Sequence, residues 1–298
     1  MSIKENNLDV AKNQSFFNSK NYHFFNKLRA FLAIVRREWT IYVRYPSWVV
    51  ALLIWPVLFP LMYIFNGKAF AGPDQTGVAV FASYTGTTNY VGFIALGSLL
   101  YMWINWVLWS FGSFLRNEQV RGTLESNWLA PMPRVLLLAG AGVTSCIQQG
   151  FILVISLLQF YLVLGIKMVG DPLQVLLVFI LTVPTVYGLG FLFASLVIWA
   201  KEVDVMVVLV RGVIMIFCGI SFPLAVMPDW MQTIAKFIPM TYAIRAFRIA
   251  YLTNQGLKAI SGDLIILAIF GIILLLLGLI AFRWTETLVR KKGTLGVY

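Results

Sequence analysis

The sequence predicts an all-α integral membrane protein with six transmembrane helices. Hydrophobic residues make up 60% of the chain and charged residues only 12%, whereas about a quarter of the residues in a soluble domain are charged. Six apolar stretches, separated by short polar breaks, approach the roughly 20 residues that a helix needs to cross the hydrocarbon core. These stretches use most of the 298 residues, so we expect no large soluble domain.

The basic residues indicate the orientation of these helices. Seventeen of the 23 Lys and Arg residues lie at every second boundary between apolar stretches, and six lie at the other boundaries. Cytoplasmic segments carry the excess of Lys and Arg, so we expect both termini in the cytoplasm. The formal net charge of +11 is therefore explained by the orientation of the chain in a lipid bilayer. We expect no nucleic-acid partner.

The chain before the first span divides into a tail and an amphipathic helix. Residues 1–23 are polar and predict a cytoplasmic tail. Residues 24–45 place apolar side chains, Trp39 among them, on one side of a helix and Arg29, Arg36, Arg37 and Arg44 on another. Such a helix can lie in the headgroup layer as an interfacial helix. The alternative is a plain cytoplasmic helix that leads into the first span.

The first three spans follow within the transmembrane domain, residues 46–283. We expect spans at 47–65, 90–114 and 135–164, with an external loop at 66–84. The second span carries the rings of Tyr101, Trp103, Trp106 and Trp109, which are spread over more than two turns. These four rings cannot all lie at one membrane depth, so some must face protein or a translocation path. Polar amides inside the second and third spans either bond to neighbouring helices or line this path. The candidate path residues are Tyr101, Trp103, Asn105, Trp106, Gln148 and Gln149.

Three further spans are predicted at 172–199, 205–221 and 264–282. Between the last two, residues 222–254 contain too many prolines to form a span and too many apolar residues to lie free in water. Two short helices that enter the outer leaflet part of the way, a re-entrant helical hairpin, would satisfy both constraints. Residues 284–298 are basic and predict a second cytoplasmic tail against anionic lipid.

A polar segment between the second and third spans, residues 115–134, interrupts the apolar sequence. Glu118, Arg121 and Glu125 follow helical spacing, which predicts that they share one face of a helix. Pro131 and Pro133 would end this helix before the next span. The alternative is a solvated loop without a function of its own.

The polar segment resembles the cytoplasmic loop of the ABC-2 type transporter permeases. It contains the pattern E-x-x-x-G-T-L-E followed by P-x-x-R. The resemblance implies that this loop contacts a separate ATPase subunit and receives its mechanical stroke. The coupling residues that it implies are Glu118, Arg121, Gly122, Thr123, Leu124, Glu125, Pro131 and Arg134.

The segment before the last span resembles the external re-entrant region of the same permeases. The resemblance rests on residues 227–230 and on the pattern P-x-T-Y-x-x-x-x-x-R at residues 239–248. Arg245 and Arg248 add cations there, which would suit an anionic cargo or, alternatively, lipid headgroups. The candidate residues of this region are Pro228, Trp230, Pro239, Tyr242, Arg245 and Arg248.

The resemblance implies a permease subunit of an ABC exporter, in its daunorubicin-resistance-like branch. Such a subunit moves an amphiphilic drug, lipid or glycan outward across the cytoplasmic (inner) membrane. It pairs with a second permease copy, as a homodimer or as a paralogous heterodimer, and with an ABC ATPase on the cytoplasmic side. The ATP and Mg belong to that ATPase, because this chain lacks the phosphate-binding pattern G-x-x-x-x-G-K-[ST]. We therefore expect neither a catalytic residue nor a metal or cofactor site in this chain.

A membrane-embedded enzyme and an ion-coupled carrier are the alternative functions. Both generally need ionisable groups near the middle of the membrane. None of the six predicted spans has a carboxylate or a histidine at its centre, which favours the transport subunit.

Overall fold

The structure is a computed structural model that describes residues 20–71, 76–120, 122, 133–200 and 203–292. Every regular element within these ranges is a helix. Four helical segments in them are long and apolar enough to cross a membrane, Tyr90–Gly112, Val135–Leu164, Pro172–Val197 and Leu257–Leu288. The prediction of an all-α, multi-pass membrane protein is confirmed. The sequence predicted six spans, two more than these four. The other two candidates are shorter: the apolar helical stretch Leu53–Ala69 and the helix Val203–Phe217, which has 15 residues.

The first half of the described chain forms five helices. They are α2 (Lys20–Arg44), α3 (Pro46–Ala71), α4 (Thr76–Thr85), α5 (Tyr90–Gly112) and α6 (Phe114–Val120). Tyr45 separates α2 from α3, because a residue that precedes a proline disfavours the α conformation. Pro46 then begins α3, a position where its missing N–H costs nothing. Helix α3 continues through Pro56 and Pro60 as one element.

The second half contains four long helices and three short elements. They are α8 (Val135–Leu164), α9 (Pro172–Ala200), α10 (Val203–Phe217), the 3₁₀ turn η1 (Leu224–Val226), α11 (Asp229–Ala235), α12 (Pro239–Leu252) and α13 (Leu257–Lys292). Helix α8 has the bounds that the sequence predicts. Helix α10, with 15 residues, rises about 22 Å, less than the roughly 30 Å of the hydrocarbon core.

Local signals set the ends of the spanning helices. The side-chain oxygen of Asn89 accepts from the N–H of Gly92 at 2.8 Å and begins α5. Gly165 ends α8 with a φ of +66°, which allows the N–H of Ile166 to donate to the carbonyl of Phe160 at 3.1 Å. Asp171 Oδ1 accepts from the N–H of Leu173 at 2.9 Å at the start of α9.

Helices α9 and α13 form the most extensive packing in the described chain. Glycines allow their backbones to approach. A Cβ atom at Gly188 would lie 2.5 Å from the backbone nitrogen of Leu275, and one at Gly278 would lie 2.6 Å from the carbonyl oxygen of Gly188. Helix α5 packs on α9 and is the most buried of the spanning helices, so α5 and α9 make up the centre of the bundle, and α13 packs on α9 with its other side exposed.

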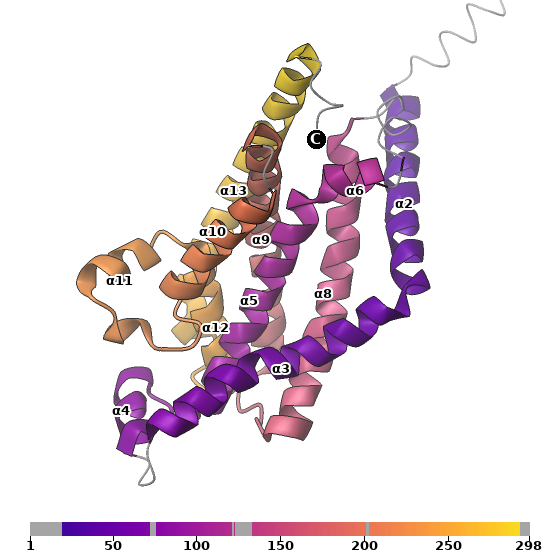
Figure 1. The fold of residues 1–298 in the computed structure, drawn as a ribbon. Helices are drawn as coiled ribbons and strands as arrows, with labels where there is room; N and C mark the ends of the chain where they lie inside the picture. Colours follow the sequence, from indigo (N-terminus) through magenta and orange to yellow (C-terminus); the bar gives the residue numbers. More distant parts are fainter. Residues whose placement is uncertain (1–19, 72–75, 121, 123–132, 201–202, 293–298) are drawn as a thin grey trace, which may run out of the picture.

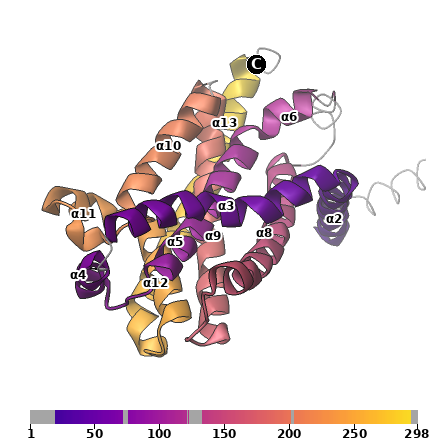
Figure 2. The same cartoon turned by 60° about the horizontal axis from the view of Figure 1, so that its bottom comes forward.

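The remaining helices surround this centre. Helix α2 packs on α8, and Figures 1 and 2 show α3 crossing obliquely over α5 and α8, which it contacts. In Figure 1, α6 and the last turns of α13 lie toward one end of the bundle, and α4 and α12 lie toward the opposite end. We call these the loop end and the α12 end. The two ends correspond to the sides that the sequence assigns to the cytoplasm and to the exterior.

Two segments that the sequence analysis placed outside the spans, an external loop and a basic tail, contain helical residues. Residues 66–84 were expected to form an external loop, but α3 extends to Ala71 and α4 occupies Thr76–Thr85. The apolar side chain of Phe81 on α4 packs edge-on against Phe93 of α5, with 5.1 Å between the ring centroids. At the other end of the chain, α13 continues to Lys292, so the first part of the predicted basic tail extends the last helix. In both segments, the change from apolar to polar sequence indicates where a predicted span ends, but a helix can continue beyond that point.

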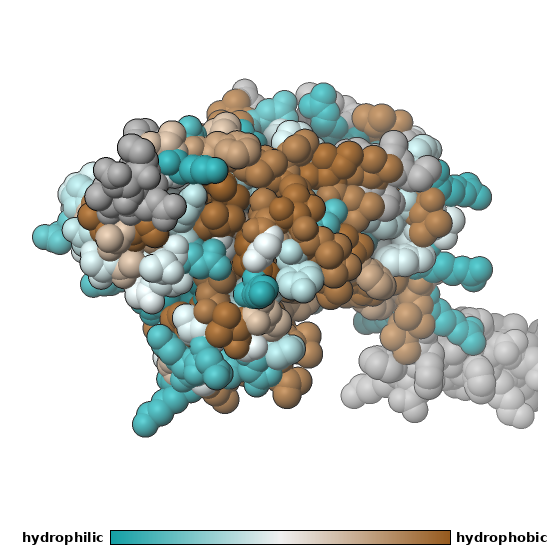
Figure 3. Space-filling model, turned by 90° about the horizontal axis from the view of Figure 1, so that it is seen from below, coloured by the Kyte–Doolittle hydropathy of each residue, from teal (hydrophilic) through white to brown (hydrophobic). Residues whose placement is uncertain are grey.

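The outer surface of the bundle is strongly apolar. Figure 3, seen from the α12 end, shows a broad apolar area across the middle of the face, with polar side chains within it and toward the edges. Large apolar side chains are exposed along α3, α8 and α13, among them Trp55, Met62, Val154, Leu162, Ile265 and Ile272. A soluble protein rarely exposes so much contiguous apolar surface, and a surface of this kind suits lipid or another membrane subunit.

Candidate functional site

The predicted coupling loop begins with helix α6 and a sharp turn. Helix α6 ends at Val120, and Gly122 has a φ of +67°. An α-helix cannot continue through a residue with positive φ. Helix α6 therefore ends before Gly122, and Glu125, which was predicted to share a helix face with Glu118, lies outside the described residues. Five predicted coupling residues lie outside the described residues, namely Arg121, Thr123, Leu124, Glu125 and Pro131.

Glu118 joins α6 to α2. Its side chain is only 2% exposed, and one carboxylate oxygen forms an ion pair with the guanidinium of Arg37. Arg37 also lies 3.2 Å from the carboxylate of its neighbour Glu38. Glu118 was predicted to couple to an ATPase, and the structure adds that its carboxylate faces α2. A displacement of α6 would therefore act directly on α2.

Arg134 joins the end of the predicted loop to the last helix. It lies directly before α8, and its Nε is 3.9 Å from Oε1 of Glu286 on α13. This ion pair is long and partly exposed, so its net contribution to stability is small, about 0–1 kcal/mol. Its position shows that the last turns of α13 lie beside the loop end of α8.

The predicted interfacial helix, α2, lies lengthwise against the first half of α8. The hydroxyl of Thr144 donates to the carbonyl of Val35 at 3.4 Å, and a Cβ atom at Gly140 would lie 2.6 Å from the side chain of Ile34. The rings of Trp39 and Phe151 are 6.3 Å apart. The headgroup position of this helix stays a prediction. Four residues of α2 were predicted to lie at the membrane interface. Of these, Arg36, Trp39 and Arg44 are exposed and Arg37 is half-buried.

The predicted path residues divide into a buried group and a half-buried group. Tyr101 and Trp103 of α5 are buried, and their rings stack on Phe59 at 5.6 Å and on Phe179 at 4.8 Å. Gln148 and Gln149 of α8 are also buried. Asn105 and Trp106 are half-buried. Within one copy of the chain, Tyr101 and Trp103 thus serve the packing of α5, and a role of these six residues in a path stays a prediction.

The region predicted as a re-entrant hairpin contains the short helix α11 and the longer helix α12. Pro228 precedes α11, and Pro239 is the first residue of α12. Most of α12 is buried against α13, α9 and α5. Trp230 on α11 is 61% exposed, as is common for Trp at a membrane interface. The depth of this region in the membrane stays a prediction.

Arg248 of α12 is buried and bonds to backbone carbonyl oxygens. Its guanidinium donates to Phe93 O at 2.9 Å, to Gly219 O at 2.9 Å and to Ile220 O at 2.6 Å, and it lies over the ring of Phe93. Gly219 and Ile220 follow the C-terminus of α10, where carbonyl oxygens lack helical partners and carry partial negative charge. Three of the five guanidinium N–H donors therefore tie α12 to α5 and to the segment after α10.

Arg245 of α12 has a different partner. Its Nε donates to Asp263 Oδ2 of α13 at 2.8 Å, and a second guanidinium nitrogen donates to Oδ1. This two-pronged hydrogen bond to Asp263 raises the pKa of the Arg245 guanidinium. The side chain of Arg245 is half-exposed and that of Asp263 is buried, so the pair lies at the edge of the α12–α13 contact.

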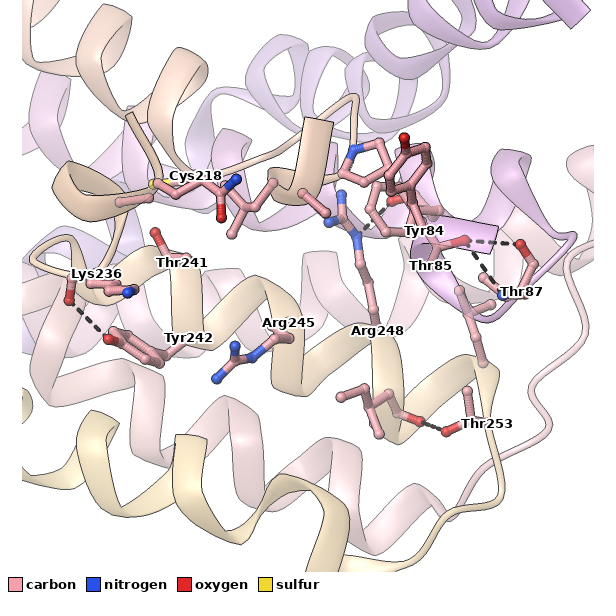
Figure 4. Close-up of a pocket in the computed structure, with 18 residues that line it drawn as sticks. Tyr84, Thr85, Thr87, Cys218, Lys236, Thr241, Tyr242, Arg245, Arg248 and Thr253 are labelled. Atoms are coloured by element: carbon pink, nitrogen blue, oxygen red, sulfur yellow. Dashed lines mark hydrogen bonds between the residues drawn. The ribbon is translucent and has the colours of Figure 1, made fainter. Parts of the chain in front are cut away.

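A cavity of about 640 Å³ lies between α4, α11 and α12, and we call it the α12 cavity. Figure 4 shows Thr241 and Arg248 projecting from α12 into the space, with Lys236 and Thr87 at its opposite ends. Its other polar or thiol-bearing lining residues are Tyr84, Thr85, Cys218, Gln232, Tyr242, Arg245 and Thr253. Tyr242, Arg245 and Arg248 were predicted for this region and share the cavity, whereas Pro228, Trp230 and Pro239 do not line it.

Sequence reasoning missed the partners of these arginines. Asp263 was placed outside the last span, and Arg37 was assigned to the headgroup layer. The available signal was charge: Asp263 is an acidic residue at the edge of a long apolar stretch, and a buried carboxylate needs a cation. Which of the cations at that end of the chain it pairs with depends on the packing of α12 on α13.

Apolar spanning helices, with an ion-paired loop end and a lined cavity at the α12 end, define a multi-pass membrane protein. The family model of the ABC-2 type transporters matches residues 29–252. The chain therefore belongs to the ABC-2 type transporter family, whose members are permease subunits with a separate ATPase protein. The comparison with curated proteins found no significant match.

Proposed function

We propose that this chain is the membrane permease of an ABC exporter that a separate ATPase drives. The family match supports the permease part of the proposal. The observation that carries the coupling part is the ion pair between Glu118 of α6 and Arg37 of α2. It connects the loop that corresponds to the family's ATPase-contacting loop with the helix that leads into α3.

The proposed cycle starts on the partner. ATP and Mg bind to the ABC ATPase on the cytoplasmic side of the inner membrane, and two ATPase subunits close on each other. The loop at residues 115–134 follows this movement, and α6 passes it to α2 through Glu118 and Arg37. Helix α2 then tilts α3, which lies across α5 and α8.

The translocation path lies between two copies of the permease in this proposal. The apolar, exposed sides of α3 and α8 offer surfaces for a second copy or for lipid. Helices α3 and α10 complete a set of six spans, with α11 and α12 as a re-entrant hairpin on the outer side. Both termini then lie in the cytoplasm, and an amphiphilic drug, lipid or glycan leaves outward.

The test is transport in sealed vesicles. The full-length chain is reconstituted with and without the ABC ATPase that co-purifies with it, and the efflux of labelled amphiphiles is measured with ATP and Mg present. The proposal expects efflux only with both proteins and ATP. Transport by this chain alone along an ion gradient would favour the ion-coupled carrier, and turnover of a substrate by this chain alone would favour the membrane-embedded enzyme.

A further inference from the structure

We propose that the α12 cavity binds a phosphate-bearing ligand. The inference concerns binding by this chain alone, so it stands apart from the proposed transport cycle. It rests on the charge of the cavity lining, on an unused hydroxyl group and on the orientation of α12.

The charge of the lining is positive. Lys236, Arg245 and Arg248 line the cavity, and its lining includes no Asp or Glu. Asp263, on α13 outside the lining, neutralises Arg245. The ammonium of Lys236 forms no ion pair with any residue that the structure describes. Carbonyl oxygens accept from three of the five N–H donors of Arg248 without cancelling its formal charge. A buried charge acts over a longer range than one in water.

A buried hydroxyl group supplies a specific donor. Thr241 is 5% exposed, and its Oγ1 has no strong hydrogen-bond partner among the described residues. The thiol of Cys218, a weak hydrogen-bonding group, is its polar neighbour. A buried hydroxyl without a good partner is costly, and a phosphate oxygen in the cavity would accept its hydrogen bond.

The orientation of α12 adds to this preference. Thr241 and Tyr242 lie in the first turn of α12, a helix of 14 residues whose N-terminus borders the cavity. The N-terminus of a helix favours negative charge. Apolar side chains, among them Leu224, Ile249 and Leu252, also line the cavity, so it can hold the glycerol or acyl part next to a phosphate group.

The probes distinguish a lipid headgroup from a soluble phosphate ester. The purified full-length chain in a neutral detergent is given phosphatidylglycerol or phosphatidylcholine with the same acyl chains, and native mass spectrometry measures the bound fraction of each lipid. Equilibrium dialysis measures the binding of glycerol 3-phosphate to the same preparation. Because choline carries a cation that offsets the phosphate, the proposal expects phosphatidylglycerol to bind more tightly than phosphatidylcholine.

The variants test the cavity itself. Lys236→Gln removes an exposed cation and should weaken binding of the preferred probe about tenfold. Lys258→Gln removes an exposed lysine from the first turns of α13, outside the lining, and serves as the matched control. Thr241→Val should weaken binding at nearly constant side-chain volume. Asp263→Asn should strengthen binding several-fold, because Arg245 loses its counter-charge.

The binding results distinguish a lipid ligand, a soluble phosphate ester and the absence of a specific site. Preference for phosphatidylglycerol that Lys236→Gln reduces and Lys258→Gln leaves unchanged supports the proposal with a lipid as the source. Binding of glycerol 3-phosphate with the same variant pattern supports it with a soluble ester as the source. Equal effects of Lys236→Gln and Lys258→Gln, or no binding of either probe by a chain whose thermal unfolding matches the wild type, would overturn the proposal.

Discussion

Arginine side chains hold the structure together in two different ways at its two ends. Arg37 at the loop end meets the carboxylate of Glu118, whereas Arg248 at the α12 end meets only carbonyl oxygens and an aromatic ring. An ion pair can break and form again when helices move. Three carbonyl bonds to two other parts of the chain are harder to replace, because each carbonyl oxygen would lose its partner in the interior.

The Arg37–Glu118 pair predicts an asymmetric response to substitution. Arg37→Gln leaves the buried Glu118 without this cation and should lower the free energy of unfolding by about 1–3 kcal/mol. Glu118→Gln should cost less, because Arg37 keeps Glu38 nearby. Thermal unfolding of both single variants and of the double variant measures the coupling between the two residues. Purely additive effects would show that the pair contributes nothing to stability.

Arg248 predicts a large loss of stability. Arg248→Met removes the donors for three carbonyl groups and should lower the free energy of unfolding by about 3 kcal/mol or more. Arg283→Met on the exposed surface of α13 is the control, and it should stay within about 0.5 kcal/mol of the wild type. Denaturant or thermal unfolding in detergent gives both values. Comparable stability of the two variants would contradict the role of Arg248 in joining α5, α10 and α12.

At the scale of elements, the sequence predicts the bounds of those helices that hydrophobic length determines. The bounds of α8 and the start of α5 and α9 agree with the predicted spans, because apolar length, proline and capping residues mark them. The helical state of residues 76–85 and 284–292 could not be read from polarity, because water and the headgroup layer permit a helix as readily as a loop. The end of α6 at Val120 could not be predicted, because the sequence alone does not show that Gly122 has a positive φ.

The packing of α9 on α13 predicts opposite effects for two glycines of the same helix. Gly278→Ala would place a methyl group 2.6 Å from the carbonyl oxygen of Gly188 and 2.7 Å from Phe191 Cβ, and should lower the free energy of unfolding by about 1–3 kcal/mol. Gly262→Ala meets no atom within 4 Å and should be neutral or stabilising by up to about 1 kcal/mol. Thermal unfolding in the same detergent checks both. A destabilising Gly262→Ala together with a neutral Gly278→Ala would contradict this packing.

At the scale of the molecule, the bundle has a closely packed interior and an ion pair near each end. Helices α5, α9 and α13 pack closely, whereas α2 and α3 lie along their outside. The pairing of Arg245 with Asp263 could not be predicted from the sequence, because it depends on how two separate helices pack. The assignment of the two ends to the cytoplasm and the exterior stays a prediction from the sequence, which rests on the charge asymmetry along the chain.

This orientation predicts which end a membrane-impermeant thiol reagent reaches in intact cells. The test starts from a background in which Cys146 and Cys218 are replaced by Ala, followed by single cysteines at two exposed positions. Phe237, after α11, is 76% exposed, and Val120, at the end of α6, is 80% exposed. The reagent should label Phe237→Cys in intact cells and Val120→Cys only after the membrane is permeabilised. Because both side chains are exposed to a similar extent, a difference in labelling reports the side of the membrane. Labelling of Val120→Cys in intact cells would place the loop end outside, where no ATPase could drive it.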